Sequence, residues 1–149
     1  LVNCIERLKL EHEIPANVQI ESSLPVNAAI FSNAETFEII LGKLLINAWE
    51  SYPNDVPPTE RKIQLAVSIS HKTNPAALEL KVIDHGTGIA PEIADTIFEP
   101  FTTTKTAVGR GMGLTIARHT IRNLAGEITL KPNTNLGVTA TMTHPLQAR

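Results

Sequence analysis

Alternating apolar and polar residues in two pairs of neighbouring segments constrain the fold of this chain more than any other feature. Apolar residues occupy alternate positions of 63–69 and of 78–82, and turn-forming residues separate the two runs. Residues 128–130 and 138–142 repeat this arrangement near the end of the chain. Half-buried strands that are joined by a short turn pair as antiparallel hairpins. We therefore predict two such hairpins and a further short strand at 18–21.

The clearest helix follows Ser32, which forms a capping-box pattern with Glu35. Lys43, Asn47 and Glu50 share a polar stripe on this helix, because residues three or four apart lie on one face. The apolar residues recur at the spacing of a buried stripe, at Phe37, Ile40, Leu41, Leu44, Leu45 and Ala48.

Two further segments favour helices. Residues 112–124 carry apolar side chains at helical spacing, and Gly126 is placed to end that helix. Residues 91–97 suit a short helix with a proline in its first turn. The order along the chain groups strands with strands, which implies antiparallel pairing. We predict an α+β fold, a two-layer α/β sandwich in which a mixed, mostly antiparallel sheet has its helices packed on one face.

The composition is that of an ordinary globular protein and limits the classes of partner. The 149 residues suffice for one domain, and a formal net charge of −2 gives no basic surface for nucleic acid. The single cysteine, Cys4, cannot form an internal disulfide, and no apolar run approaches the ~20 residues that cross a bilayer. The chain begins at Leu1 without a methionine or a signal-like segment. We expect residues 1–149 to be one cytoplasmic domain of a longer protein, and whether that parent is anchored in a membrane stays open.

Two glycine clusters indicate where a ligand binds. Gly109, Gly111 and Gly113 alternate directly before the helix that contains Leu114. A glycine-rich backbone at a helix N-terminus can press its N–H groups onto phosphate. The other cluster follows the strand that runs into Asp84, whose carboxylate can accept a hydrogen bond from an exocyclic amine such as that of adenine. Each cluster alone is a weak signal, but the two together predict a nucleotide site.

The residues themselves leave alternatives open. An isolated helix asparagine such as Asn47 usually bonds locally, although its amide oxygen is also a suitable ligand for Mg²⁺. Asp84 has an ordinary role as a turn cap, and the later glycines have one as a hinge. Lys105 and Arg110 are either solvated surface charges or contacts to terminal phosphates.

Four motifs in order make the chain resemble the ATP-binding catalytic domain of bacterial sensor histidine kinases. Their wider superfamily also holds DNA gyrase B, the MutL repair proteins and the heat-shock chaperone ATPases. Residues 44–48 are similar to the family's asparagine box and residues 84–89 to its first glycine box. Residues 97–105 are similar to its phenylalanine box and lid, and residues 109–114 to its second glycine box. The resemblance covers nearly the whole chain.

The resemblance implies ATP and Mg²⁺ as cofactors and assigns roles to the matching positions. Asn47 would coordinate the magnesium ion and, with Lys105, act in catalysis. Asp84 would receive the adenine amine, while Phe98 and Phe101 would flank a lid that closes when phosphates bind. The implied nucleotide-binding positions, besides Asp84, are Gly86, Gly88, Ile89, Phe101, Lys105, Gly109, Arg110, Gly111, Met112, Gly113, Leu114 and Thr141.

Two positions depart from the family pattern. Lys43 stands where sensor kinases usually have a second asparagine and the related ATPases a glutamate, and a lysine cannot act as the water-activating carboxylate. Two alternatives stay open for Lys43, contact with a phosphate and weaker metal binding. Val138 follows Gly137 where the family has threonine, so that Thr139 or Thr141 would have to supply the missing hydroxyl. Despite these departures we still expect nucleotide binding, whereas full kinase activity stays open.

The resemblance implies a domain that binds Mg-ATP and donates the γ-phosphoryl group to a histidine on a separate dimerisation domain, with a response regulator downstream. This chain shows no acceptor motif, because Pro15 follows His12 too early to allow the acceptor helix. We expect the isolated domain to be monomeric, inactive without the acceptor domain and without affinity for nucleic acid. Two alternatives stay open, a degenerate non-catalytic nucleotide-binding regulatory module and a serine kinase of the anti-sigma type.

Overall fold

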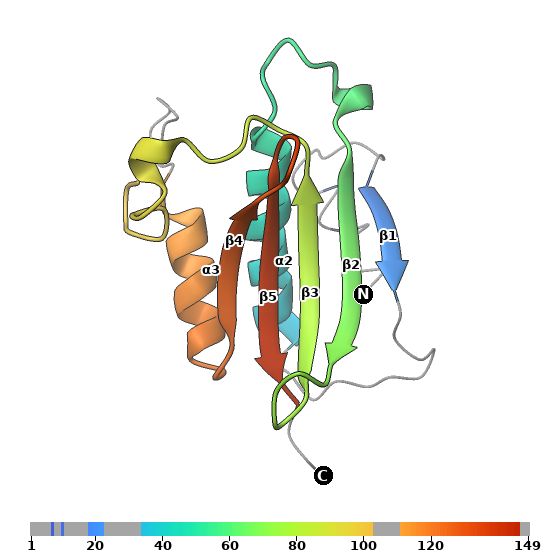
Figure 1. The fold of residues 1–149 in the computed structure, drawn as a ribbon, viewed down its shortest axis with the longest axis vertical. Helices are drawn as coiled ribbons and strands as arrows, with labels where there is room; N and C mark the ends of the chain where they lie inside the picture. Colours follow the sequence, from blue (N-terminus) through green and yellow to red (C-terminus); the bar gives the residue numbers. More distant parts are fainter. Residues whose placement is uncertain (1–6, 8–9, 11–17, 23–33, 103–110, 147–149) are drawn as a thin grey trace.

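A five-stranded sheet and a layer of helices make up the part of the chain that the computed structural model describes, residues 7, 10, 18–22, 34–102 and 111–146 (Figure 1). The strands are β1 (Val18–Ser22), β2 (Ile63–Ser70), β3 (Ala77–Asp84), β4 (Glu127–Pro132) and β5 (Val138–Pro145). The α-helices are α2 (Ala34–Glu50) and α3 (Gly113–Arg122), and short 3-10 helices occur at η1 (Pro58–Glu60) and η2 (Pro91–Ile93).

The strand order β1-β2-β3-β5-β4 contains both predicted hairpins. β2 pairs antiparallel with β3, which sets Ile63 opposite Asp84, and β4 pairs antiparallel with β5. β3 and β5 are antiparallel neighbours and join the hairpins into one sheet, while β1 runs parallel to β2. The mixed, mostly antiparallel sheet is therefore confirmed, and with it the α+β class.

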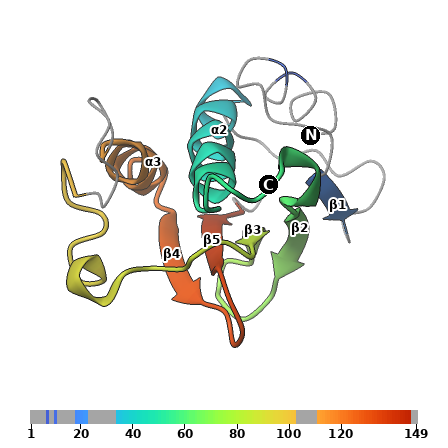
Figure 2. The same ribbon diagram turned by 90° about the horizontal axis from the view of Figure 1, so that it is seen from above.

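Helices α2 and α3 contact each other and cover the same face of the sheet (Figure 2). The apolar stripe predicted for α2 is buried, and Ile40 and Leu45 at its centre are inaccessible to solvent. Burial of a side chain of this size contributes about 1.5–3 kcal/mol. α3 adds Ala117 and Ile121 to the same core, whereas Ile116 on its other side is exposed. The core is thus one layer between the sheet and the two helices.

Alternation along the central strands decides which side chains face the helices. In β3 the even-numbered positions from Leu78 are buried, and in β5 the even-numbered positions from Val138 are buried. Asp84 ends β3 on this buried face, so the strand delivers a carboxylate to the helix layer. Thr141 occupies an intervening position of β5 and therefore lies on the opposite face of the sheet.

The helix predicted for residues 91–97 is wrong beyond its first turn. Only η2 forms there, and the chain continues in turns to residue 101. The backbone hydrogen bonds Ala94 N to Pro91 O, Thr96 N to Ile93 O and Glu99 N to Thr96 O each span three residues. Bonds of this kind close tight turns and do not propagate an α-helix.

The end of α3 also differs from the prediction. The residue in the left-handed conformation is Ala125, with φ 58°, and the N–H of Gly126 donates to Ile121 O at 2.9 Å. A Cβ on Gly126 would lie 2.3 Å from Thr143 O and 2.6 Å from a side-chain carbon of Ile121. Gly126 is therefore required for close packing against β5, and Ala125 makes the turn that ends the helix.

Some predictions fall outside the described residues. They include the Ser32 half of the capping box and the segment 103–110, which contains most of the expected lid. Among the helices of the described part, none is both long enough and apolar enough to span a membrane.

Candidate functional site

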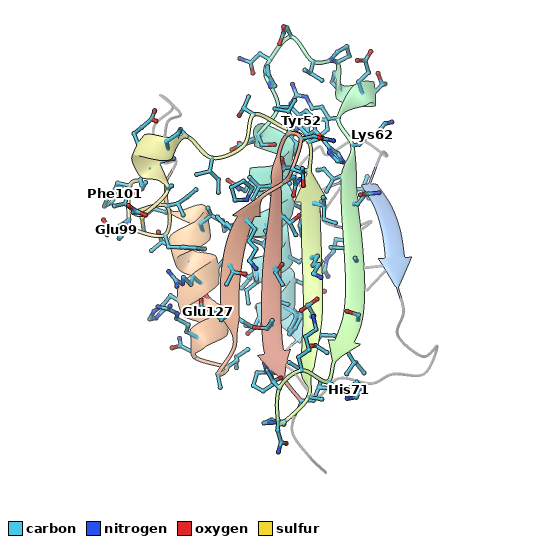
Figure 3. All side chains as sticks on the ribbon, in the orientation of Figure 1. Tyr52, Lys62, His71, Glu99, Phe101 and Glu127 are labelled. Carbon is cyan, nitrogen blue, oxygen red and sulfur yellow. The ribbon has the colours of Figure 1, made fainter. Side chains whose placement is uncertain are left out.

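A cavity of about 490 Å³ lies where α2 ends, β3 ends and α3 begins. Small-molecule sites typically occupy about 300–1,000 Å³. Tyr52 and Lys62 mark this end of the sheet in Figure 3, and His71 marks the opposite end. The topology brings together three segments that are distant in sequence, the asparagine-bearing helix and the two glycine clusters.

Asp84 is fixed at the cavity through one of its two carboxylate oxygens. Oδ1 accepts hydrogen bonds from Gly86 N at 2.9 Å, from the Ser51 hydroxyl at 3.0 Å and from Val138 N at 3.3 Å. Oδ2 accepts no hydrogen bond from any residue that the structure describes. The residue is 3% exposed; this burial raises the pKa of Asp84, and the three hydrogen bonds counter that rise. The arrangement leaves one acceptor atom for a ligand.

Ser51 connects the end of α2 to the loop after β3, and the sequence analysis missed it. Its hydroxyl lies 2.8 Å from Ala48 O and 3.0 Å from Asp84 Oδ1, so one proton serves two acceptors. Its carbonyl accepts from Thr87 N at 2.9 Å and from Thr87 Oγ1 at 3.0 Å. Its place in the sequence could have indicated this role, because Ser51 follows Asn47 by four residues and so lies one helical turn further along the same face.

Tyr52 was also missed, and it secures the other side of Asp84. Its hydroxyl donates to Lys62 O at 2.5 Å and accepts from His85 N at 3.0 Å. Tyr52 lines the cavity and is buried, and this burial raises the pKa of its phenol. The hydroxyl thus links the start of β2 to the residue that follows Asp84.

The loop after β3 needs its glycines for two different reasons. A Cβ on Gly86 would lie 1.9 Å from Ser51 Oγ, so close approach excludes a side chain there. Gly88 has φ +83°, a conformation that side chains disfavour. Gly88 and Ile89 line the cavity, whereas Gly86 is not part of the lining and acts on it through Ser51.

The β4–β5 turn holds the backbone of Asp84. Asn133 Nδ2 donates to Asp84 O at 2.9 Å, and Thr139 Oγ1 donates to Asn133 Oδ1 at 2.7 Å. A Cβ on Gly137, whose φ is +87°, would lie 2.1 Å from Asp84 O. The hydroxyl of Thr139 is therefore engaged within the turn, and neither it nor Thr141 replaces the hydroxyl that Val138 lacks.

Lys43 and Asn47 line the cavity from one side of α2, as the predicted polar stripe requires. Within the described residues, neither side chain has a hydrogen bond or an ion pair. The same part of the chain contains no group of three or more His, Cys, Asp or Glu side chains that would hold a metal. A metal ion here would need oxygen ligands from a bound molecule in addition to the Asn47 amide oxygen.

The N-terminus of α3 faces the same cavity. Gly111, Gly113 and Leu114 line it, and Met112 at the N-cap position forms no side-chain capping hydrogen bond and is not part of the lining. The first N–H groups of an α-helix have no partner within the helix, and they form the positive end of its dipole. This end of the cavity therefore presents N–H donors that suit an anion.

Phe101 lies beside the start of α3 but outside the cavity (Figure 3). Its N–H donates to Gly111 O at 3.1 Å, it has φ 63°, and it is 77% exposed. A Cβ on Gly111 would lie 2.8 Å from the Phe101 backbone, so the two residues pack through their main chains. Phe98 instead packs against the core, with the Arg118 guanidinium 4.2 Å from its ring centroid.

The structure thus gathers part of the predicted set and separates the rest. Phe101 and Thr141 lie away from the cavity: strand alternation places Thr141 on the opposite face of the sheet, and Phe101 is exposed. Lys105, Gly109 and Arg110 lie outside the described residues, so their roles stay predictions. The predicted residues that meet at the cavity are Asn47, Asp84, Gly88, Ile89, Gly111, Gly113 and Leu114.

Comparison with known proteins shows the family of this chain. Residues 32–148 match the family described as histidine kinase-, DNA gyrase B-, and HSP90-like ATPase, and the chain belongs to this family. It is 31% identical over 114 residues to the two-component sensor PprA of Pseudomonas aeruginosa. The matched stretch covers 75% of this chain and 12% of PprA. It is 26% identical over 130 residues to the sensor protein EvgS of Escherichia coli (strain K12), which covers 85% of this chain and 10% of that protein.

The fold is also shared with a solved kinase domain. The catalytic domain of the histidine kinase ThkA superposes with a TM-score of 0.75 at 25% identity, over 98% of this chain and 92% of that one. The predicted resemblance to sensor-kinase ATP-binding domains is therefore confirmed. The chain spans about a tenth of the length of PprA and EvgS, 12% and 10% respectively.

Proposed function

We propose that this chain binds Mg-ATP in the cavity and donates the γ-phosphoryl group to a histidine on a separate dimerisation domain, in two-component signal transduction. One observation carries the proposal: Asp84 is buried, its Oδ1 is held by three hydrogen bonds, and its Oδ2 has no partner among the described residues. The sensor-kinase relatives support the same function.

The residues around Asp84 fit an adenine ring. Oδ2 would accept from the exocyclic amine, and burial would strengthen that hydrogen bond by excluding competing water. Ile89 and Val138 supply apolar walls, and the φ of Gly88 turns the backbone along the cavity. A site with mostly apolar walls and one fixed polar group is typical of small-molecule recognition.

The residues at the other end fit phosphates and a magnesium ion. The uncapped N–H groups at the start of α3, with Gly111 and Gly113, would donate to phosphate oxygens, and the Asn47 amide oxygen would ligate the ion. When bound, Mg-ATP supplies a transferable phosphoryl group whose charge the metal partly neutralises.

In this reaction the chain would orient the phosphates of the nucleotide and would not need to activate the nucleophile. Lys43 occupies the position at which related ATPases have a water-activating carboxylate, which disfavours hydrolysis. An imidazole acceptor is itself the nucleophile, so the cavity has only to hold the phosphates in line with it and to exclude water.

The proposal extends to the setting of the domain. We propose that residues 1–149 form the excised catalytic domain of a sensor kinase, acting in the cytoplasm on the acceptor domain of its parent, with a response regulator downstream. By itself the domain would be monomeric and would not bind nucleic acid. The roles of Lys105, Gly109 and Arg110 as phosphate contacts belong to the same proposal.

Phosphotransfer to the parent's acceptor domain tests the proposal. The chain, Mg-ATP labelled at the γ-phosphate and the acceptor domain should yield acid-labile phosphohistidine. An acceptor in which the histidine is replaced is the matched control and should stay unlabelled. Demonstrated ATP binding without any transfer to the intact acceptor would contradict the proposed reaction.

The position of Lys43 favours a second candidate, a non-catalytic module whose nucleotide state regulates a partner. A cation one helical turn from Asn47 competes electrostatically with a metal ion at that site. Calorimetry with ATP in magnesium and in EDTA separates the candidates. The kinase requires binding that magnesium strengthens, whereas the regulatory module is favoured by tight binding that is independent of magnesium.

A further inference from the structure

Lys43 is a charged group of the cavity lining to which the proposed function assigns no contact with the ligand. It lies on α2, one helical turn before Asn47, and its side chain lines the cavity. Lys43 Cδ is 3.9 Å from the point at which a Cβ of Gly113 would stand, so the aliphatic stem runs past the first residue of α3. Within the described residues its ammonium has no ion-pair partner.

Two positive groups therefore converge from different elements. The start of α3 carries the positive end of the helix dipole and receives no side-chain cap from Met112, and the Lys43 stem reaches it from α2. Cations are favourable near helix C-termini and unfavourable near N-termini, so this placement gains nothing in the free protein. The carboxylate of Glu50, on the same stripe of α2, is two helical turns from Lys43, about 10 Å along the axis.

We infer that Lys43 is a phosphate-binding residue that contacts the terminal phosphates of the nucleotide together with the N–H groups of α3. The inference rests on the proposed nucleotide site. An anion placed between the two positive groups turns their mutual repulsion into attraction on both sides. The ammonium offers three rotatable donors, and at Gly113 no side chain stands beside the Lys43 stem at the start of α3.

This role defines the class of ligand and its metal dependence. The contribution of Lys43 grows with the number of phosphates and is absent for the nucleoside. Part of the charge neutralisation comes from the protein, so di- and triphosphates keep measurable affinity without a divalent cation. Both properties hold whether the domain transfers the phosphoryl group or only binds the nucleotide.

Binding of adenosine, ADP and ATP to the 149-residue chain in EDTA tests the inference. We compare wild type with Lys43→Met, which keeps the length of the side chain without its charge, and with Lys43→Arg, which keeps the charge. Lys72→Met is the matched control, because Lys72 is exposed in the β2–β3 turn at the far end of the sheet. Calorimetry gives the ADP and ATP affinities, NMR titration gives that of adenosine, and thermal melts verify folding.

The expected result is a selective loss. Lys43→Met should weaken ATP and ADP by about tenfold or more, because it removes a charge-assisted hydrogen bond, and should leave adenosine unchanged. Lys43→Arg should retain most of the affinity, and Lys72→Met should match wild type. Equal affinities of Lys43→Met and wild type for ADP would overturn the inference while leaving the site intact. An equal loss for adenosine would overturn it by showing that Lys43 acts on the cavity itself. A wild-type chain that binds none of the three ligands in EDTA would overturn this inference. The same result in the presence of magnesium would overturn the proposed function as well.

Discussion

The two ends of the cavity differ in whether their polar groups already have hydrogen-bond partners within the protein. At the Asp84 end the groups already hold one another: Ser51, Tyr52 and Asn133 each bond to Asp84 or to the residue after it. At the α3 end the N-cap residue Met112 forms no side-chain capping hydrogen bond, and among the described residues a Cβ on Gly113 would meet Lys43 Cδ, at 3.9 Å. The first end is organised before a ligand arrives, whereas the second has donors and charge whose partner is the ligand.

This difference separates folding from binding. At the Asp84 end the same hydrogen bonds fix the loop after β3 and position the acceptor, so substitutions there should affect both stability and ligand affinity. At the α3 end little of the folded structure depends on the exposed donors, so substitutions there should affect binding alone. Preorganised polar groups bind at low additional cost in ordering, which favours the Asp84 end as the determinant of base recognition.

The largest effect is expected from Asp84→Asn. The three donors around Oδ1 hold an acceptor at that position, so the new amide would place its NH₂ where Oδ2 now lies. Two donors would then face each other in a buried site, and we expect ATP affinity to fall about 100-fold or more. Calorimetry measures the loss, and a melting temperature close to that of wild type shows that the fold is retained. Unchanged ATP affinity would remove Asp84 from the binding site.

Gly86 lies against Ser51 at the Asp84 end of the cavity, and Gly113 begins α3 at the other end. A Cβ on Gly86 would meet Ser51 Oγ at 1.9 Å and Ser51 C at 2.6 Å, so Gly86→Ala should destabilise the fold by about 1–3 kcal/mol through overpacking. Gly113→Ala should leave the free energy of unfolding within about 1 kcal/mol of wild type, since its nearest neighbour is a flexible lysine carbon at 3.9 Å. Urea unfolding of the two variants measures this contrast.

Nucleotide binding by the same two variants completes the test. Gly113→Ala should weaken the binding of ATP and leave the binding of adenosine unchanged, because the added methyl group would stand where the phosphates approach α3. If Gly113→Ala destabilised the fold as strongly as Gly86→Ala, the α3 end would be as tightly organised as the Asp84 end, and the comparison would fail.

The sequence predicted those features that depend on local periodicity. Period-two alternation in 63–69 and 78–82 specified a hairpin because one face of the sheet is buried, and the same alternation placed Asp84 on the face of the core. Helical spacing in α2 predicted which of its residues are buried. The position of Asn47 at the cavity followed from its place on the polar stripe of that helix.

The remainder depended on contacts between distant segments. Ser51 and Tyr52 carry no recognisable motif, and their roles arise because β3 ends beside the end of α2. Gly126 reads as a helix stop in sequence, but its small size serves packing against Thr143 in β5. The hydroxyl of Thr141 led to its prediction as a nucleotide-binding residue, and only its register in β5 shows that it lies on the face of the sheet opposite the helices.

Ser51→Ala should produce an intermediate effect with a pH signature. The Ser51 hydroxyl is one of the groups that lower the pKa of Asp84 against the rise caused by burial, so its removal raises that pKa further. The carboxylate is the form that accepts from the amine, so binding weakens as the pH falls toward the pKa of Asp84. In Ser51→Ala this loss should begin at a higher pH, and affinity at pH 7 should fall about 3- to 10-fold for one lost hydrogen bond.

Calorimetric ATP titrations over a range of pH measure the affinity at pH 7 and the pH at which binding is lost. Ser70→Ala is the matched control, because Ser70 bonds only locally, to Lys72 N, in the distant β2–β3 turn. Identical pH profiles for Ser51→Ala and wild type would show that Ser51 does not set the state of Asp84.

The smallest effect is expected from Glu127→Gln, which probes the far end of α3. Glu127 Oε1 accepts from Arg118 Nε at 2.8 Å, and Oε2 accepts from Arg122 at 2.7 Å, which ties the last turns of the helix to the start of β4 (Figure 3). Burial acts to raise the pKa of Glu127, but the hydrogen bonds from Arg122, Arg118 and Ile128 N lower it to about 2. Because the pKa in the folded state lies below the ordinary value of 4.5, the contribution of the carboxylate to stability is fully present above pH 4.5 and disappears as the pH falls toward 2. The side chain of Glu127 is 36% exposed, and those of Arg118 and Arg122 are 30% and 53% exposed. We therefore expect Glu127→Gln to lose less than about 1 kcal/mol of stability at pH 7.

Urea unfolding at pH 7 and at pH 3 measures this contribution, and the gap between wild type and Glu127→Gln should narrow at the lower pH. Glu79→Gln is the matched control, because it removes a single ion pair, with Lys81 at 2.7 Å, on the open face of β3. ATP affinity of Glu127→Gln should equal that of wild type, since the start of α3 is positioned by its packing against α2 and not by this ion pair. A clear loss of ATP binding in Glu127→Gln would mean that the N-terminal end of α3, which faces the cavity, is positioned by the ion pairs at its C-terminal end. The α3 end of the cavity would then depend on contacts within the protein, as the Asp84 end does.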